Sequence, residues 1–334
     1  MEELLTEVAR SSRCGNHIFV LQRKLAKFAS EQECLADLHR AEFRKLSQAA
    51  AQNFSLLSKA AGYVEIKIGD QFQTNTRENS WTVGHRKLLH GRLLEKPRLI
   101  LEDAHSDGEV YALVLGKGTV VGREMQIEFD ACHGGGNQTF RRLREQVQAG
   151  AVSICICDND MLAPGSARSE TFNKAETEAN KCEFVGGFFN PPYREIENLI
   201  PIEILRECYP RVSPKRLDKL QKLIADQDEV EQGDCLWLYF DVKEGVEGEK
   251  LIEKCPNSAS QNWLASKYTN GDIGCLTDVS FPGFGDSVVS TLLDSGPALK
   301  EFHKFLRSDY WAQHLQPFFE QIAWYLVGEK KARI

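Results

Sequence analysis

The chain has 334 residues, 42% of them hydrophobic and 27% charged, which allows a buried core and excludes global disorder. A formal net charge of −7 argues against a protein coated for nucleic acid, and no segment approaches the roughly eighteen apolar residues of a membrane span. The ten cysteines contain no Cys-x-x-Cys pair, and the acidic N-terminal segment lacks the pattern of a secretory signal. We therefore expect a cytoplasmic protein with reduced thiols and no membrane contact.

Residues 1–96 have the pattern of a mainly helical region. Ser30 and Glu33 have the Ser-x-x-Glu form of a capping box, which predicts the start of a helix. Apolar side chains that follow at three- and four-residue steps predict one face of that helix: Phe43, Leu46, Ala50, Phe54 and Leu57. A short β-like piece is expected at 63–69, and the polar stretch 70–80 is expected to be a loop.

Short apolar runs alternate with helical patterns through residues 97–205. The expected strands are 98–102, 126–132, 153–158 and 183–189. Because helical patterns separate these runs, the alternation predicts an α/β domain whose parallel sheet of about four strands is flanked by helices. Residues 206–334 are expected to form a mainly helical region, with a strand or buried segment at 235–245.

Acidic residues follow three of the four expected strands. Glu102 ends the first strand, Asp158 and Asp160 form an Asp-x-Asp at the end of the third, and Glu195 and Glu197 follow the fourth. Ligands of parallel α/β sheets gather at the carboxyl ends of the strands, so these acids are expected to converge. Converging carboxylates need a cation, and hard oxygen ligands favour Mg²⁺ or Mn²⁺. For each acid alone, a turn or helix-cap role is the competing interpretation.

Four sequence stretches together resemble the TOPRIM domain of topoisomerases, primases and bacterial nucleases. They are LILEDAHSDGEVY, GGGNQTFRRL, ICICDNDMLAPGS and REIENLIP, and they cover about a third of the chain. The resemblance implies metal ligands at Glu102, Asp107, Asp158, Asp160 and Glu197, with Glu195 as an alternative to Glu197. The family usually has Gly after the first Glu, whereas this chain has Asp103 there and one more residue before Asp107. Either Asp103 is an additional acid at the metal or the turn is remodelled.

TOPRIM nucleases hydrolyse phosphodiester bonds with two divalent ions, so the resemblance implies a Mg²⁺- or Mn²⁺-dependent nuclease. Glu102, Asp158 and Asp160 are expected to bind the metal directly, with Asp107 and Glu197 supporting a second ion. Such nucleases often add a lysine after the domain to stabilise transition-state charge, and Lys243 in YFDVKEG is the candidate. A surface-turn role for Lys243 is the alternative.

Three functions remain open at this point. The first is a nuclease, with DNA favoured over RNA, acting as effector of a bacterial antiphage defence system. The second is a non-cleaving TOPRIM-like regulatory subunit that binds metal and nucleotide or nucleic-acid ends. The third is a structural or assembly protein. Because an acidic surface opposes encounter with DNA, a protein partner such as an ATPase, or a homo-oligomer, is expected.

Three histidine-containing features have weaker functional interpretations. His105 could transfer a proton, and His133 could contact phosphate, although a solvated loop position explains each. Cys14, His17, Cys34 and His39 could bind zinc, but their spacing is irregular.

Overall fold

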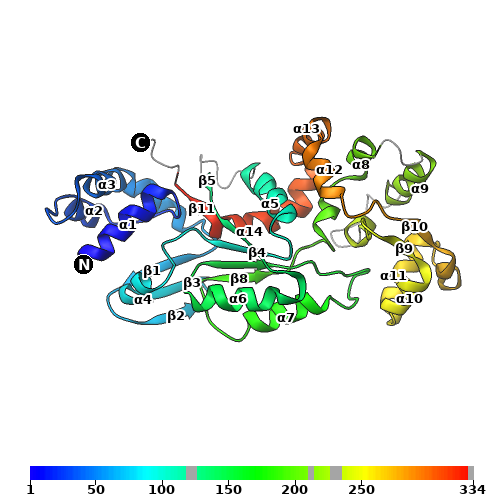
Figure 1. Cartoon of the computed structure of the whole chain (residues 1–334), viewed down its shortest axis with the longest axis horizontal. Helices are drawn as coiled ribbons and strands as arrows, with labels where there is room; N and C mark the ends of the chain where they lie inside the picture. The colour runs from blue at the N-terminus through cyan, green and yellow to red at the C-terminus, as the bar shows by residue number, and fades with distance from the viewer. Residues whose placement is uncertain (118–125, 210–213, 226–234, 330–334) are drawn as a thin grey trace. The chain divides into compact units, whose positions relative to one another are not determined.

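The computed structural model describes residues 1–117, 126–209, 214–225 and 235–329 (Figure 1). The chain forms two compact units. Unit 1 comprises Met1–Ile156, Ala175–Phe189 and Phe319–Ile334, and unit 2 comprises Cys157–Lys174 and Asn190–Phe318. The division passes through the expected α/β region, and the three sequence regions 1–96, 97–205 and 206–334 remain a prediction about domains.

The N-terminal part of unit 1 contains four helices, and the first three of them contribute to an apolar core. They are α1 (Glu2–Cys14), α2 (Arg23–Ser30), α3 (Asp37–Leu57) and α4 (His85–His90). Phe43 and Leu46 of α3 are fully buried in this core, as the helical spacing predicts. The predicted capping box is wrong, because Ser30 is the last residue of α2 and its hydroxyl bonds to the Lys27 carbonyl within that helix.

A three-stranded sheet adjoins these helices in sequence. It has the order β1-β3-β2 and consists of β1 (Tyr63–Lys67), β2 (Phe72–Asn75) and β3 (Ser80–Gly84). The loop expected at 70–80 is therefore wrong, since β2 and the start of β3 form an antiparallel hairpin there. Strand β2 has no buried residue, so its sequence lacks the apolar signal of a strand and its pairing with β3 determines the structure.

The central sheet of unit 1 has four strands, all parallel, in the order β6-β4-β7-β8. The strands are β4 (Arg98–Leu101), β6 (Asp130–His133), β7 (Ser153–Ile156) and β8 (Gly186–Phe189). Its two inner strands, β4 and β7, are almost entirely buried because each is a continuous apolar run covered on both faces. The predicted α/β class with a four-stranded parallel sheet flanked by helices is confirmed.

One expected strand, 126–132, is two strands in the structure. Strand β5 (Gln126–Ile127) pairs antiparallel with β11 (Val327–Gly328), and only β6, from Asp130, joins the central sheet. The acid Glu128 lies between them, and Asp130, the first residue of β6, accepts a hydrogen bond from Arg98 of β4. Charged side chains interrupt the apolar pattern at the point where the pairing partner changes.

Helices cover both faces of the central sheet. Helix α5 (Ser106–Lys117) packs on β4, and α6 (Thr139–Gln148) packs on β4 and β7. The crossovers β4-α5-β6 and β6-α6-β7 run in opposite directions along the sheet, so right-handed connections require α5 and α6 on opposite faces, as Figure 1 shows. The flanking elements are η1 (Gly136–Gln138), α7 (Glu170–Ala179) and α14 (Gln316–Leu326).

Unit 2 is mainly helical. Its helices are α8 (Ile202–Cys208), α9 (Pro214–Ala225), α10 (Gly248–Lys254), α11 (Ser258–Tyr268), α12 (Val288–Asp294) and α13 (Gly296–Phe305). Its shorter elements are η2 (Ile196–Leu199), η3 (Leu236–Tyr239), η4 (Ile273–Asp278), the π-helical turn η5 (Trp311–Leu315) and the antiparallel pair β9 (Gly245–Glu247) and β10 (Ser280–Pro282). Its largest fully buried side chains are Tyr193, Phe172, Phe240 and Phe302. No helix in the described part of the chain has the length and hydropathy to cross a lipid bilayer.

Candidate functional site

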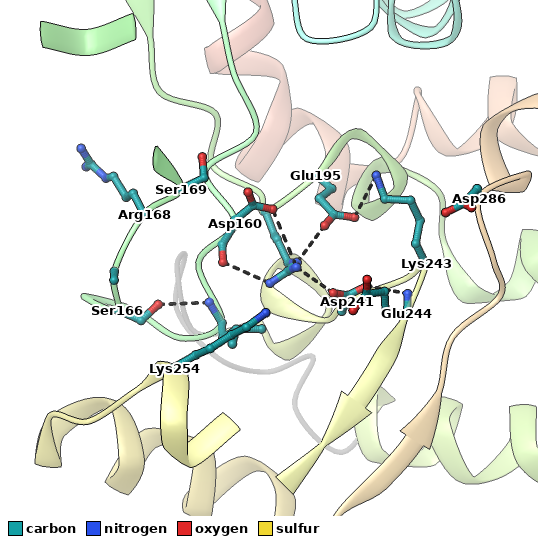
Figure 2. A pocket seen from close by; sticks show the side chains of 13 residues that line it. Asp160, Ser166, Arg168, Ser169, Glu195, Asp241, Lys243, Glu244, Lys254 and Asp286 are labelled. Atoms are coloured by element: carbon teal, nitrogen blue, oxygen red, sulfur yellow. Dashed lines mark hydrogen bonds and ion pairs between the residues drawn. The ribbon is translucent and has the colours of Figure 1, made fainter. Parts of the chain in front are cut away.

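A cavity of about 550 Å³ lies within unit 2 (Figure 2). Three segments supply most of its wall: the loop 160–169 that leads to α7, residues 194–195 before η2, and residues 241–244 after η3. Lys254 at the end of α10 and Asp286 also line it. The cavity therefore brings together charged side chains from segments that are far apart in sequence.

Arg194 is the centre of the ion pairs in this cavity. Its Nη2 lies 2.7 Å from Asp241 Oδ2, its Nε donates to Glu195 Oε1 at 3.1 Å, and its Nη1 donates to the Asp160 carbonyl at 3.0 Å. The Arg194 side chain is only 6% exposed. Burial lowers the pKa of the guanidinium, but Glu195 and Asp241 outweigh burial and raise that pKa. Arg194 is thus a permanent buried cation held by two buried carboxylates.

The backbone of Arg194 also fixes the loop that carries Asp160. The Arg194 carbonyl accepts a hydrogen bond from Asn159 N at 3.1 Å, and Asn159 Nδ2 donates to the Tyr193 carbonyl at 2.9 Å. Asp160 adopts a φ of 55°, a left-handed conformation that a non-glycine residue rarely takes. Its Oδ1 lies 3.7 Å from Arg194 Nη2. The contacts with Arg194 therefore hold both the strained backbone and the carboxylate of Asp160.

Lys243 lies between two buried glutamates. Its Nζ is 3.4 Å from Glu195 Oε2 and 3.5 Å from Glu197 Oε1. Burial lowers the pKa of this ammonium, but Glu195, Glu197 and then Asp158 outweigh burial and raise the pKa above its usual range. Lys243 is therefore protonated at neutral pH and can stabilise negative charge, whereas it cannot serve as a general base.

Asn198 holds the segment of Lys243 against the segment of Glu195. Its Oδ1 accepts from Glu195 N at 2.9 Å, and its Nδ2 donates to the carbonyls of Trp237 at 2.6 Å and Phe240 at 2.8 Å. The first of these bonds forms half of a capping box at η2, in which the Glu195 side chain accepts from the backbone of Asn198. The sequence Arg-Glu-Ile-Glu-Asn thus supplies both the charges of the site and the clamp that positions them.

Two of the predicted site residues, Glu102 and Asp107, lie in unit 1. Glu102 directly follows β4, and its carbonyl accepts a hydrogen bond from Gly135 N of the glycine-rich loop at 3.1 Å. Asp107 lies in the first turn of α5, where its carboxylate accepts from Asp103 N and from Ser106 Oγ. The remaining predicted residues belong to unit 2, so the convergence of Glu102 and Asp107 with them stays a prediction.

Asp103 has a structural role at the start of α5. Its carboxylate accepts hydrogen bonds from His105 N at 2.9 Å and from Ser106 Oγ at 2.8 Å. These two bonds lower the pKa of Asp103, and they close the turn between β4 and the helix. His133 contacts the same turn, because its Nδ1 accepts from Ala104 N at 3.3 Å. Asp103 therefore has a local structural function in the turn before α5.

The other predicted residues lie in or beside the cavity of unit 2. Asp158 begins the loop two residues after β7, and its carbonyl accepts from Ser169 Oγ at 3.1 Å. Asp160, Glu197 and Lys243 belong to one ion-pair network with Arg194. Glu195, the alternative to Glu197, contacts both cations of that network.

Two residues of the network, Arg194 and Asp241, are not among those predicted from the sequence. Asp241 is buried and lies within an apolar run, between Phe240 and Val242. A charged residue inside such a run is a recognisable signal, because a buried carboxylate requires a cationic partner. The partner, Arg194, is 47 residues away in sequence. The sequence around Asp241 therefore indicates that a cationic partner exists but does not identify it.

The acidic side chains in unit 2 are carboxylates, the type of ligand that divalent cations such as Mg²⁺ prefer. Within the described residues, no three or more His, Cys, Asp or Glu side chains form a ready-made metal cluster, and the set Cys14, His17, Cys34 and His39 is no exception. The ion-pair network nevertheless has four carboxylates and two cations, an excess that matches one divalent ion. Glu197 Oε2 is buried and accepts no hydrogen bond from any described residue, so it is available to such an ion.

Titration of Glu195 gives a test of the buried network. Burial raises the pKa of Glu195 from 4.5 to about 7, against the opposing effect of Arg194 and Lys243. Because the folded state then binds more protons than the unfolded state between these two values, stability falls as pH rises through this window. We expect urea denaturation to show wild type losing stability relative to Glu195→Gln from pH 4.5 to 7 and a constant difference above 7. If the difference in stability between wild type and Glu195→Gln does not depend on pH, the raised pKa of Glu195 is contradicted.

Comparisons with known proteins give no relative from which a function could be transferred. No protein-family model, no curated protein and no solved structure matches the chain.

Proposed function

We propose that this protein is a Mg²⁺- or Mn²⁺-dependent nuclease with a TOPRIM-like core, cleaving nucleic acid, with DNA favoured over RNA. The observation that supports this function best is the contact of Lys243 with Glu195 and Glu197. Lys243 and the two glutamates are all residues that the resemblance indicates. The lysine is more than forty residues from the glutamates in sequence, yet it lies within ion-pair distance of both. In this proposal the protein is the effector of an antiphage defence system and acts with a partner such as an ATPase.

The register of the central sheet is a second support. Leu99 of β4 lies opposite Ile154 of β7, and Ile100 lies opposite Cys155, in parallel pairing. Both strands therefore end at the same edge of the sheet, and that edge is where α/β proteins bind their ligands. Glu102 immediately follows β4, and Asp158 lies two residues after the end of β7.

In the proposed mechanism, the residues that would hold the divalent ions are Glu102, Asp107, Asp158, Asp160 and Glu197. Ions held there would provide for activation of a water and neutralisation of the charge on the leaving oxygen. Lys243 contributes a fixed positive charge that can stabilise a phosphodiester as negative charge develops on it. Arg194 orients Asp160 by binding both its carbonyl and its carboxylate.

Lys243→Met tests this proposal in the purified full-length protein. We expect cleavage of plasmid, linear DNA or RNA in Mg²⁺ or Mn²⁺ to fall by about a hundredfold, because one charge that stabilises the transition state is lost. Lys250→Met is the matched control, since Lys250 is exposed on α10 and, among the described residues, pairs only with Glu247. Equal activity of the Lys243→Met variant and the control contradicts the role of Lys243.

The non-cleaving regulatory subunit is the second candidate function. It is favoured by the ion pairs themselves, because Arg194 and Lys243 already neutralise part of the acidic charge in the cavity. Binding of nucleic acid or nucleotide without cleavage of any of the three substrates, also when the protein encoded beside it is present, would support this candidate over the nuclease.

A further inference from the structure

The outer edge of strand β1 (Tyr63–Lys67) pairs with no other strand in the described part of the chain. Its sheet has the order β1-β3-β2, so β1 pairs with β3 on one side only. The backbone N–H and C=O groups along such an edge can pair with a further strand, and proteins usually shorten or cover edges of this kind. Four of the five residues of β1 are exposed. Within the described residues of unit 1, this edge is therefore accessible to another strand.

One face of the sheet is apolar up to this edge. Val64 lies opposite Trp81 of β3, and Ile66 lies opposite Val83. Both β3 side chains are buried, whereas Ile66 is 38% exposed and Ile68, which directly follows β1, is 80% exposed. Because alternate residues of a strand share a face, Val64, Ile66 and Ile68 form one apolar row. An added strand would remove the exposed part of this row from water, which favours its binding.

The opposite face of β1 carries two charges of opposite sign. Glu65 and Lys67 lie on either side of Ile66, and both side chains are more than half exposed. A single charge on an edge repels a second copy of the same edge. Two opposite charges placed symmetrically about one residue attract it. In an antiparallel pair of two copies centred on Ile66, each Glu65 lies opposite Lys67 of the other copy.

The same register matches the apolar row. It places Ile66 opposite Ile66 of the second copy, and Val64 opposite Ile68. Directly opposite residues of an antiparallel pair lie on one face, so apolar side chains meet apolar side chains. The registers centred on Glu65 or on Lys67 instead place like charges directly opposite each other, which is destabilising. The edge is therefore complementary to itself in the register centred on Ile66.

We propose that β1 pairs antiparallel with β1 of a second copy of this chain, across a two-fold axis at Ile66. The two three-stranded sheets then form one continuous sheet. This proposal does not rest on the proposed nuclease function. The paired segment is only residues 64–68, and so short an interface buries less than the roughly 1,200 Å² of a standard one. We therefore expect a weak dimer, with a dissociation constant on the order of 10–100 µM.

Exchange of the two charges tests the proposal. Sedimentation velocity of the full-length protein is measured from about 1 to 200 µM. We expect Glu65→Lys and Lys67→Glu each to weaken dimerisation about tenfold or more, because each places like charges opposite each other at two positions. The double variant, which carries both exchanges, is expected to dimerise as wild type does. An equimolar mixture of the two single variants is expected to form a heterodimer, since its opposite charges face each other again.

Glu31→Lys is the matched control. Glu31 is an exposed acid of unit 1 that pairs with Lys27 and lies outside the sheet, so this variant should dimerise as wild type does. Circular dichroism verifies that all variants fold. A wild-type protein that stays monomeric up to about 200 µM overturns the proposal. A dimer of equal affinity in wild type and in both single variants lies at another surface and overturns it too. If the mixed single variants fail to associate, the register centred on Ile66 is wrong.

Discussion

Glu102→Gln is expected to abolish metal-dependent cleavage, with a loss of at least about a hundredfold. The substitution keeps the size and shape of the side chain and removes its negative charge, so a divalent ion loses a ligand while the fold is retained. Glu102 is half-buried directly after the buried strand β4, and its backbone bond to Gly135 does not depend on the side chain. The measurement is the cleavage rate of plasmid DNA in Mg²⁺ and in Mn²⁺.

Glu109→Gln is the control for this variant. Glu109 lies in the first turn of α5, a few residues from Glu102, and is exposed to solvent. The Glu109→Gln variant loses the same charge, but Glu109 does not lie at the end of the strand. We therefore expect its cleavage activity to equal that of wild type. Undiminished cleavage by Glu102→Gln would end the nuclease assignment in its present form. Circular dichroism of both variants verifies that the fold is unchanged.

Arg194→Met is expected to reduce the free energy of unfolding by about 3–5 kcal/mol, because it leaves buried carboxylates without their cation. Glu195 and Asp241 both contact Arg194, and each is at least nine-tenths buried. Urea denaturation of the full-length chain gives the loss. The double variant Arg194→Met with Asp241→Leu is expected to lose less than the sum of the two single variants, since it removes both charges of one pair.

Arg206→Met is the control for the loss of a guanidinium. Arg206 on α8 pairs with Asp218 on α9, and the two side chains are 41% and 60% exposed. An exposed ion pair contributes only about 0–1 kcal/mol, so this variant should be nearly as stable as wild type. A similar small loss for Arg194→Met would show that the buried network does not stabilise unit 2.

The sequence contained enough information to identify the central sheet. Strands β4 and β7 are continuous apolar runs that could only be buried, and helical patterns between them require parallel pairing. Strand β2 was missed, and the split of 126–132 into β5 and β6 was missed, because pairing partners elsewhere in the chain determine both. A single-chain pattern reports burial, and these segments are not buried.

The candidate site was predictable in part for a related reason. Strand ends direct attention to Glu102, Asp158, Asp160 and Glu197, and the resemblance adds Asp107 and Lys243. Arg194 could not be found in this way, because its importance lies in contacts with Asp160 and Asp241, which are distant in sequence. Local spacing identifies residues at the end of a strand or on one face of a helix. A buried residue that pairs with several charges distant in sequence can be identified only in the tertiary structure.

The pairing of β11 with β5 has a consequence for biosynthesis. Val327 lies opposite Ile127, and the ring of Tyr325 contacts Trp81 and Phe189 in the same unit. These contacts join α14 and β11 to segments that are synthesised much earlier, so they cannot form until residues 325–328 have left the ribosome. Until α14 has been synthesised, Trp81 and Phe189 lack this aromatic partner, and this part of unit 1 is completed late.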